Sequence, residues 1–446
     1  MASAAEQLAS NLNFGAFAKA TELKKRIWFT LAALVIYRFG TYIPLPGIDP
    51  AVMQDIFRQN AGGILGMIDM FAGGALGRMT IFALNIMPYI SAAIIMQLMT
   101  AISPQIEALK KEGEAGRKKI NQYTRYLTVL ITAVQAYGVA AGLEGMQSSV
   151  GPAVADPGLF FRFSAVVTLT GGTLFLMWLG EQITARGIGN GISLIIFSGI
   201  VANLPQALAG TLELGRTGAL STPLILFFLA MSVGVVFFIV FVERAQRRII
   251  VQYPKRQMGN KLFGGESSHL PLKINTSGVI PPIFASSILL MPLTFISFQA
   301  GQGPEWLTAV AAYLGHGQPL YLIIYAALIA FFAFFYTAVV FNPVETADNL
   351  KKYGGFIPGI RPGVNTSEYL DRILTRLTVL GAGYLVAVSL LPEFLISKYS
   401  VPFYFGGTSL LIVVTVTLDT VGQIQSHLLA HQYEGLIKKS KLRGKK

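Results

Sequence analysis

Residues 223–242 read Pro223-Leu-Ile-Leu-Phe-Phe-Leu-Ala-Met-Ser-Val-Gly-Val-Val-Phe-Phe-Ile-Val-Phe-Val242, a run without a charged side chain. A helix needs about 20 apolar residues to cross the hydrocarbon core of a bilayer, and this run supplies them. Arg244 and the basic residues after it end the run. The segment therefore predicts a transmembrane helix.

Comparable apolar runs recur along the whole chain and are separated by polar or basic segments. The ten predicted spans are Ile27–Ile43, Leu76–Ala101, Tyr123–Leu143, Phe160–Leu179, Ile192–Leu208, Pro223–Val242, Ser277–Phe298, Leu320–Phe341, Ile373–Leu391 and Phe405–Ile424. Ten spans use about 200 residues, which leaves room for sizeable loops in a chain of 446. The expected fold is an all-α integral membrane protein.

The composition agrees with this assignment. Hydrophobic residues make up 53% of the chain and charged residues only 13%, whereas a soluble domain has about 25% charged residues. An ordinary water-soluble globule is therefore excluded. There is no cysteine, which excludes disulfides, thiolate metal sites and cysteine nucleophiles.

The net charge is +13, from 35 Lys+Arg against 22 Asp+Glu. The first explanation for this positive charge is the orientation of the chain in the membrane. Alternate loops are the basic ones, and the more basic loops of a membrane protein face the cytoplasm. Both termini are then expected to be cytoplasmic. Residues 1–26 read as an amphipathic surface segment rather than a cleavable signal, and residues 427–446 as a basic tail.

Ten spans divide into two halves of five, expected at 27–208 and 209–426. An odd number of spans per half inverts the second half in the membrane. The second span of each half is irregular: the first contains Pro88 and follows several glycines, and its counterpart contains Pro281 and Pro282. Because proline removes a backbone donor and kinks a helix, we expect these two spans to line a cavity.

The segment from about 64 to 74 is apolar but too short to span, and it has glycines on both sides. Such a piece is usually interfacial or re-entrant. Glycine hinges would let it move as a unit, but a static re-entrant loop fits the sequence equally well.

Two cytoplasmic loops, about 244–275 and 342–371, are long and basic. Positive-inside topology alone accounts for their charge. The alternative is a docking surface for an acidic or RNA-containing partner. The sequence leaves both explanations open.

Motifs for chemistry are scarce. There is no Gly-Lys-Ser/Thr phosphate loop, so an intrinsic ATPase is not expected. The glycines of Gly187-Ile-Gly-Asn-Gly191 follow no nucleotide-fold strand and are a weak cofactor motif. His427 and His431 share a helix face without a third ligand. We expect no cofactor, no metal and no enzymatic activity.

Ionisable residues inside spans usually mark ion-coupled transport. Here they are few: Arg38, expected to snorkel or pair structurally, Glu181 and Asp419. Their scarcity argues against a secondary transporter. The missing acid/base or metal set argues against an enzyme acting on lipid.

Isoleucines near the prolines of the two irregular spans are candidates for an apolar seal across a membrane pathway. Ile86 and Ile90 lie one turn apart on either side of Pro88, and Ile283 follows Pro282 in the matching span. An apolar constriction gates by dewetting. The alternative for each isoleucine is contact with lipid or a neighbouring helix.

At these residues the chain closely resembles the bacterial SecY family, the large subunit of the Sec protein-translocation channel. The motifs that carry the resemblance span nearly the whole chain. They are residues 38–49, 70–76, 86–91, 177–184, 187–193, 242–248, 269–273, 341–351 and 401–410.

The resemblance implies ten helices in two pseudo-symmetric halves, clamped by SecE with SecG alongside. It implies a pore whose waist is the ring Ile86, Ile90, Ile196, Ile200, Ile283 and Ile412. It also implies a plug that closes the outer funnel, with Ile64, Leu65, Met67, Ile68, Asp69, Met70 and Phe71. Signal sequences and membrane helices would leave into lipid through a lateral gate between spans two/three and seven/eight.

The same resemblance assigns the two cytoplasmic loops to docking of the SecA motor or the ribosome, which would drive unfolded preproteins through the channel. The docking residues it implies are Arg247, Arg248, Lys255, Arg256, Lys261 and Arg361. Relatives often have two adjacent basic residues at the tip of the first loop, where this chain reads Asn260-Lys261. The implied location is the bacterial cytoplasmic (inner) membrane.

Overall fold

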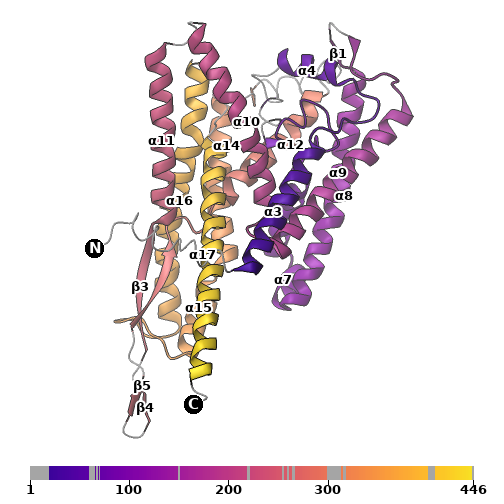
Figure 1. Ribbon diagram of the computed structural model, residues 1–446. Coiled ribbons are helices and arrows are strands. Elements are labelled where there is room, and N and C mark those ends of the chain that lie inside the picture. Colours follow the sequence, from indigo (N-terminus) through magenta and orange to yellow (C-terminus); the bar gives the residue numbers. More distant parts are fainter. Residues whose placement is uncertain are drawn as a thin grey trace. The chain divides into compact units, whose positions relative to one another are not determined.

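The computed structural model describes residues 20–59, 66, 69, 71–148, 151–217, 221–253, 256–258, 261–263, 267–298, 313–314, 318–399 and 407–443. In these residues the fold is built from helices, with short two-stranded sheets (Figure 1). The helices are α3 (Thr21–Gly40), α4 (Pro50–Gln59), α6 (Met87–Ile102), α7 (Pro104–Lys111), α8 (Glu114–Glu144), α9 (Leu159–Arg186), α10 (Gly191–Arg216), α11 (Thr222–Arg244), α12 (Ile280–Phe298), α14 (Pro319–Val340), α15 (Pro343–Lys352), α16 (Val364–Tyr399) and α17 (Gly407–Arg443). The strands are β1 (Gln147–Ser148), β2 (Gly151–Pro152), β3 (Gln246–Gln252), β4 (Arg256–Met258), β5 (Lys261–Phe263) and β6 (Ser267–Lys273).

Within the described residues, 7 helices are long and apolar enough to cross a membrane: α8, α9, α10, α11, α14, α16 and α17. Helices α6 and α7 form a further candidate as a pair bent by 97°. Helices α3 and α12 coincide with the two remaining predicted spans. Each predicted span therefore contains a helix, and the all-α membrane fold is confirmed.

The second predicted span begins later than the sequence suggested. Its helix starts at Met87 rather than Leu76, and residues 72–86 form turns in which Met79 and Asn85 have positive φ values of 44° and 50°. Pro88 lies in the first turn of α6, where a missing N–H leaves no hydrogen bond unmade. Pro281 and Pro282 likewise directly follow Ile280, the first residue of α12. These three prolines open their helices rather than break them.

The chain divides into two compact units. The first unit comprises Met1–Gly210, Met291–Ala311 and Ile412–Lys446, and in it α8 packs against α6, α7 and α9, while α3 packs against α9. The second comprises Thr211–Leu290 and Ala312–Leu411, and in it α16 packs against α14 and α15. Helix α15 begins with Pro343 and is capped by Asn342, whose Oδ1 accepts from the backbone N–H of Val344 at 3.1 Å.

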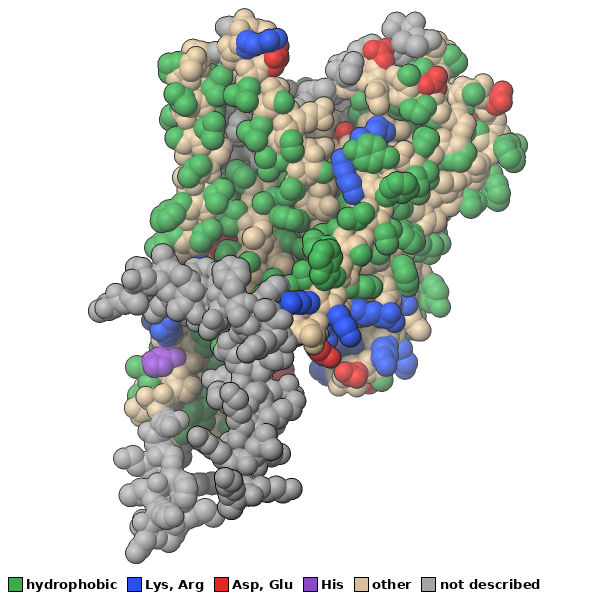
Figure 2. Space-filling view, in the orientation of Figure 1, with side chains coloured by type: hydrophobic (Ala, Val, Ile, Leu, Met, Phe, Trp, Pro, Cys, Tyr) green, Lys and Arg blue, Asp and Glu red, His purple; other side chains and the backbone are tan. Residues whose placement is uncertain are grey.

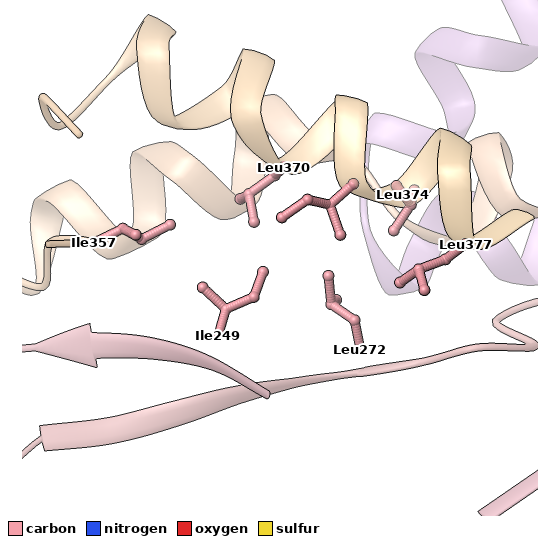
Figure 3. Close-up of a cluster of buried hydrophobic side chains, with 7 residues drawn as sticks. Ile249, Leu272, Ile357, Leu370, Leu374 and Leu377 are labelled. Atoms are coloured by element: carbon pink, nitrogen blue, oxygen red, sulfur yellow. The ribbon is translucent and has the colours of Figure 1, made fainter. Parts of the chain in front are cut away.

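The second unit has a hydrophobic core where the β3–β6 hairpin meets α16 (Figure 3). The two strands pair antiparallel from Gln246–Lys273 to Gln252–Ser267. Ile249 on β3 is buried and the next residue, Ile250, is exposed, as the alternation of a half-buried strand requires. Ile249 and Leu272 point toward Leu370 and Leu374 on α16, which fixes the hairpin to that helix.

We expect Leu370→Ala to lower the stability of this unit by about 2–5 kcal/mol, because a fully buried leucine leaves a cavity when truncated. Leu370 is 0% exposed, whereas Val364 on the same helix is 74% exposed. Val364→Ala is thus a matched control with little expected loss. Thermal unfolding of the purified protein measures both variants, and equal losses would contradict the assigned core.

Candidate functional site

The first pair of candidate pore isoleucines lies where α6 begins. Ile86 is the residue immediately before the helix, and the N–H of Ile90 donates to the Ile86 carbonyl at 3.1 Å. Both side chains are buried. The structure thus stacks them one turn apart on one face, inside the protein rather than toward lipid.

The other four isoleucines are buried as well. Ile196 and Ile200 lie one turn apart on α10, Ile412 lies on α17, and Ile283 lies in the first turn of α12. Ile283 belongs to the second compact unit and the other five to the first. Contact with lipid is therefore excluded for all six in this structure, whereas packing against a neighbouring helix, the other alternative, also buries an isoleucine.

The predicted plug is described only in part. Ile64, Leu65, Met67, Ile68 and Met70 lie outside the described residues. Asp69 and Phe71 are described, and Phe71 is buried. The Asp69 Oδ1 accepts from the Gly77 N–H at 2.6 Å, and its carbonyl accepts from the Gly74 N–H at 2.9 Å. Asp69 thereby ties the end of the predicted plug to the turns that follow.

Three side chains hold the backbone carbonyls of residues 71–73. Asn85 Nδ2 donates to the Phe71 carbonyl at 2.7 Å, the Tyr37 hydroxyl to that of Ala72 at 3.5 Å, and Arg38 Nη1 to that of Gly73 at 2.6 Å. Tyr37 and Arg38 come from α3. Irregular backbone at membrane depth needs such partners, because lipid offers none. Sequence reasoning missed these contacts, and its one signal for them was the unusual position of Arg38.

Helix α10 approaches the same carbonyls without a side chain. A Cβ on Gly199 would lie 2.7 Å from the Phe71 carbonyl oxygen and 3.3 Å from the Gly73 nitrogen. Only glycine therefore fits at position 199. Since Ile196 and Ile200 flank this glycine on α10, the plug end and this part of the candidate ring are held together.

Two arginines meet above the plug end. Arg78 Nη2 donates to the Gly73 carbonyl at 3.3 Å, so that this oxygen accepts from both Arg38 and Arg78. The guanidinium carbons of Arg38 and Arg78 lie 5.1 Å and 4.1 Å from the centre of the Tyr42 ring. This is cation–π geometry. Arg38 therefore pairs structurally, one of the two roles that the sequence suggested for it.

The candidate docking residues lie on the second unit. Arg247 and Arg248 are exposed on β3, and Arg361 is exposed in the turn before α16. Arg256 lies on β4 and Lys261 on β5, which pair antiparallel, and Lys255 lies outside the described residues. Backbone hydrogen bonds of 2.9 Å in both directions join Gln252 to Phe356 and so link the hairpin to the loop that contains Arg361.

The sequence analysis described the loop at about 244–275 only as long and basic and predicted no hairpin there. The sequence contains little signal for it, because Ile249, Ile250 and Val251 are all apolar and only the structure shows that Ile250 is exposed. A further basic group lies in the first unit at α7 and the start of α8, where Lys and Arg side chains gather in Figure 2. Its exposed members are Lys110, Lys111, Arg117, Lys118 and Lys119.

Comparison with known proteins identifies the family. The SecY family model matches residues 80–421. The protein translocase subunit SecY of Rickettsia conorii is 57% identical over 425 residues, covering 95% of this chain and 97% of the relative. That of Escherichia coli K12 is 55% identical over 424 residues, covering 95% and 96%. The chain belongs to the SecY family.

Solved structures agree on the fold. One described as a protein conducting channel has a TM-score of 0.68 at 18% identity, covering 92% of this chain and 93% of that one. Sec61 from a canine ribosome-channel complex has a TM-score of 0.64 with the same coverage. This SecY family member is therefore a multi-span membrane protein with the architecture of those channels.

In this SecY family chain, backbone N–H groups of the glycine loop Gly187–Gly191 donate hydrogen bonds to side chains of the protein itself. The Gly191 N–H donates to Thr184 Oγ1 at 2.9 Å, that of Ile188 to Thr30 Oγ1 at 3.0 Å, and that of Gly189 to Gln423 Oε1 at 2.8 Å. The loop's amides thus bind α3, α9 and α17. They are not free to bind a cofactor.

Glu181, one of the ionisable residues singled out from the sequence, has a structural partner. Glu181 accepts from Arg125 Nε at 3.1 Å and from Arg125 Nη2 at 2.6 Å, a bidentate pair between α8 and α9. His427 is exposed on α17. No group of three or more His, Cys, Asp or Glu residues suited to a metal ion occurs within the described residues.

Asp69 predicts a pH dependence. Burial raises the pKa of this carboxyl above its ordinary value, against the opposing effects of the Gly77 N–H and Arg78. The folded protein then binds the proton more tightly than the unfolded chain, so stability falls as pH rises from the ordinary to the raised pKa. Asp69→Asn keeps an oxygen acceptor for Gly77 and removes the titration.

We expect Asp69→Asn to flatten the pH dependence of the unfolding temperature and to gain stability at pH 8 relative to the parent. Thermal unfolding between pH 4 and pH 8 measures this. Asp55→Asn, at a carboxyl in α4 that is not buried, is the control. Parallel pH profiles of the parent and Asp69→Asn would refute the raised pKa.

Proposed function

We propose that this chain is the channel-forming subunit of a protein translocase, through which unfolded polypeptides cross the membrane and membrane helices pass sideways into lipid. The observation that carries the proposal is its 57% identity, over 95% of its length, to a protein translocase subunit. The two halves of the channel are 27–208 and 209–426. The chain catalyses no reaction.

The six isoleucines form the waist of this channel. An aliphatic constriction excludes ions because water leaves it readily. The same surface makes only weak, non-directional contacts with each passing side chain, so it accepts polypeptides of unrelated sequence. Their burial, in three helices of the first unit and one of the second, supports this role.

The segment from 64 to 74 acts as the plug on the outer side of the waist. Its support is the position of Phe71 beside Gly199, between the two isoleucines of α10. Arg38 and Asn85 hold the backbone at the end of this plug through the carbonyls of Gly73 and Phe71. The lateral gate lies between spans two/three and seven/eight.

The energy that moves the polypeptide through the channel comes from partner proteins. SecA or the ribosome docks on the basic surface formed by the hairpin and the Arg361 turn, whose positive charge suits an acidic motor or ribosomal RNA. SecE and SecG complete the channel. The complex resides in the bacterial cytoplasmic membrane with both termini in the cytoplasm.

Reconstitution tests the function directly. The chain, SecE and SecG are placed in proteoliposomes, and SecA, ATP and an unfolded preprotein with a signal sequence are added outside. We expect the preprotein to become protected from protease only when all components are present. Protection that is independent of the chain would overturn the proposal.

Replacing Ile86 and Ile90 by glycine should raise the resting ion conductance several-fold, because the seal loses its apolar surface. Ile95→Gly is the matched control, since Ile95 lies on the same helix and is 39% exposed. Conductance of the complex in planar bilayers measures both. Unchanged conductance after replacement of Ile86 and Ile90, or an equal leak in the control, would reject the ring assignment.

Charge reversal at Arg361 should weaken binding of SecA or the ribosome at low ionic strength, with the difference shrinking as salt rises, because exposed charges are screened within about 8 Å at physiological salt. Arg361→Lys keeps the charge and should bind nearly as the parent does. Affinity across a salt series provides the measurement. Equal affinity of Arg361→Glu and parent at low salt would exclude the contact.

A further inference from the structure

A buried carboxylate lies at the cytoplasmic end of α11 in the second unit. Glu243 is only 8% exposed, and its Oε1 accepts from Asn275 Nδ2 at 2.7 Å. Asn275 is also buried. Withdrawing a carboxylate from water is costly unless hydrogen bonds replace the lost hydration. Neither a docking surface nor an aliphatic seal requires a glutamate here.

The pair sits where the β3–β6 hairpin joins its two flanking helices. Strand pairing ends at Gln246 and Lys273. The Ile274 N–H then donates to the Ala245 carbonyl at 3.1 Å. Glu243 and Asn275 add the next rung through their side chains. The hydrogen bonds of the hairpin are therefore continued to Glu243 in the last turn of α11 and to Asn275, which lies five residues before α12 begins.

Asn275 also holds the start of α12. The same Nδ2 donates to the Gly278 carbonyl at 3.0 Å, and Asn275 Oδ1 accepts from the Ser277 hydroxyl at 3.0 Å. Gly278 has a φ of +62°, a turn that favours glycine. Ile283 follows within the first turn of α12, its N–H bonded to the Val279 carbonyl.

Helix α16 closes the junction from a third side. A Cβ on Gly381 would lie 3.0 Å from the Ile274 carbonyl oxygen, so the helix backbone rests directly against this turn. One turn away, the Tyr384 ring meets Phe238 of α11 edge-on with centroids 5.8 Å apart. The hairpin also packs on α16 through Ile249 and Leu272 (Figure 3). The junction has little freedom to shift by itself.

We propose that Glu243 is a positioning residue: through Asn275 it fixes the first turn of α12, and with it Ile283, to the base of the β3–β6 hairpin, so that a displacement of the hairpin is transmitted to α12. The importance of Ile283 as a seal rests on the proposed function. The clamp itself, meaning the hydrogen-bonded link from Glu243 through Asn275 to the start of α12, does not rest on it.

The clamp can be measured without reference to transport. The chain has no cysteine, so nitroxide labels at Ile250→Cys on β3 and Ile288→Cys on α12 report one distance by pulsed electron paramagnetic resonance in the reconstituted complex. Ile250 is exposed and Ile288 is half-buried, so neither label has to displace a fully buried side chain. Glu243→Leu and Asn275→Ala should each add a second distance to the distribution, from molecules in which α12 is displaced relative to the hairpin. We expect the population of these molecules to be about ten-fold or more above that in the parent, because losing a hydrogen bond to a charged group changes an equilibrium by about that factor.

Glu243→Gln is the isosteric control, because its amide oxygen still accepts from Asn275, and we expect its distance distribution to match the parent's. Glu345→Leu, at an exposed carboxyl on α15, should also leave the distribution unchanged. An unchanged distribution in both Glu243→Leu and Asn275→Ala overturns the clamp, and a change equally large in Glu243→Gln overturns the hydrogen bond as its basis.

The link to the seal has its own readout. Glu243→Leu should raise resting conductance as Ile283→Gly does, while Glu243→Gln should not. If Ile283→Gly leaks and Glu243→Leu does not, Glu243 does not position Ile283. If Ile283→Gly does not leak, the ring assignment fails, and the distance distributions alone decide the clamp.

Discussion

A bilayer supplies no hydrogen bonds, so each backbone N–H and C=O at membrane depth must find its partner in protein. Helices meet this demand by themselves. Residues 72–86 do not form a helix, yet the first unit encloses them. Arg38, Tyr37 and Asn85 donate to three consecutive carbonyls of residues 71–73, and Gly199 leaves room for that backbone against α10. The irregular segment exists because these partners exist.

This constraint also places the candidate plug beside the candidate ring. The side chains that satisfy the irregular backbone come from α3 and from the turn before α6, and the glycine that admits it lies between Ile196 and Ile200. The backbone that ends the plug is thus fixed to the helix that carries two ring isoleucines.

Several polar groups in the described residues hold backbone and helices in position. The Arg125–Glu181 pair joins α8 to α9, the glycine loop binds Gln423 and Thr184, and Glu243 binds Asn275. The isoleucines proposed for the waist have no chemistry beyond apolar bulk. A pathway that must accept many sequences benefits from this division, since a polar group at the narrow point would favour some passing residues and retain others.

The amino-acid sequence alone determined the membrane class and the spans, because length and apolar content of a segment decide whether it crosses a bilayer, and both are local properties. Each predicted span contains a helix. The resemblance of its motifs to the SecY family was confirmed by the comparisons. The sequence also pointed to Ile86, Ile90 and Ile283 through their neighbouring prolines.

Only the tertiary structure decided how the irregular parts are held. Pro88 opens α6 instead of kinking it, the first basic loop is a hairpin packed on α16, and Arg38 reaches a carbonyl 35 residues along the chain. Each depends on partners distant in sequence, which no local pattern encodes. The buried Glu243 accepts a hydrogen bond from the amide of Asn275, 32 residues along the chain, and that pairing arises only when the hairpin closes.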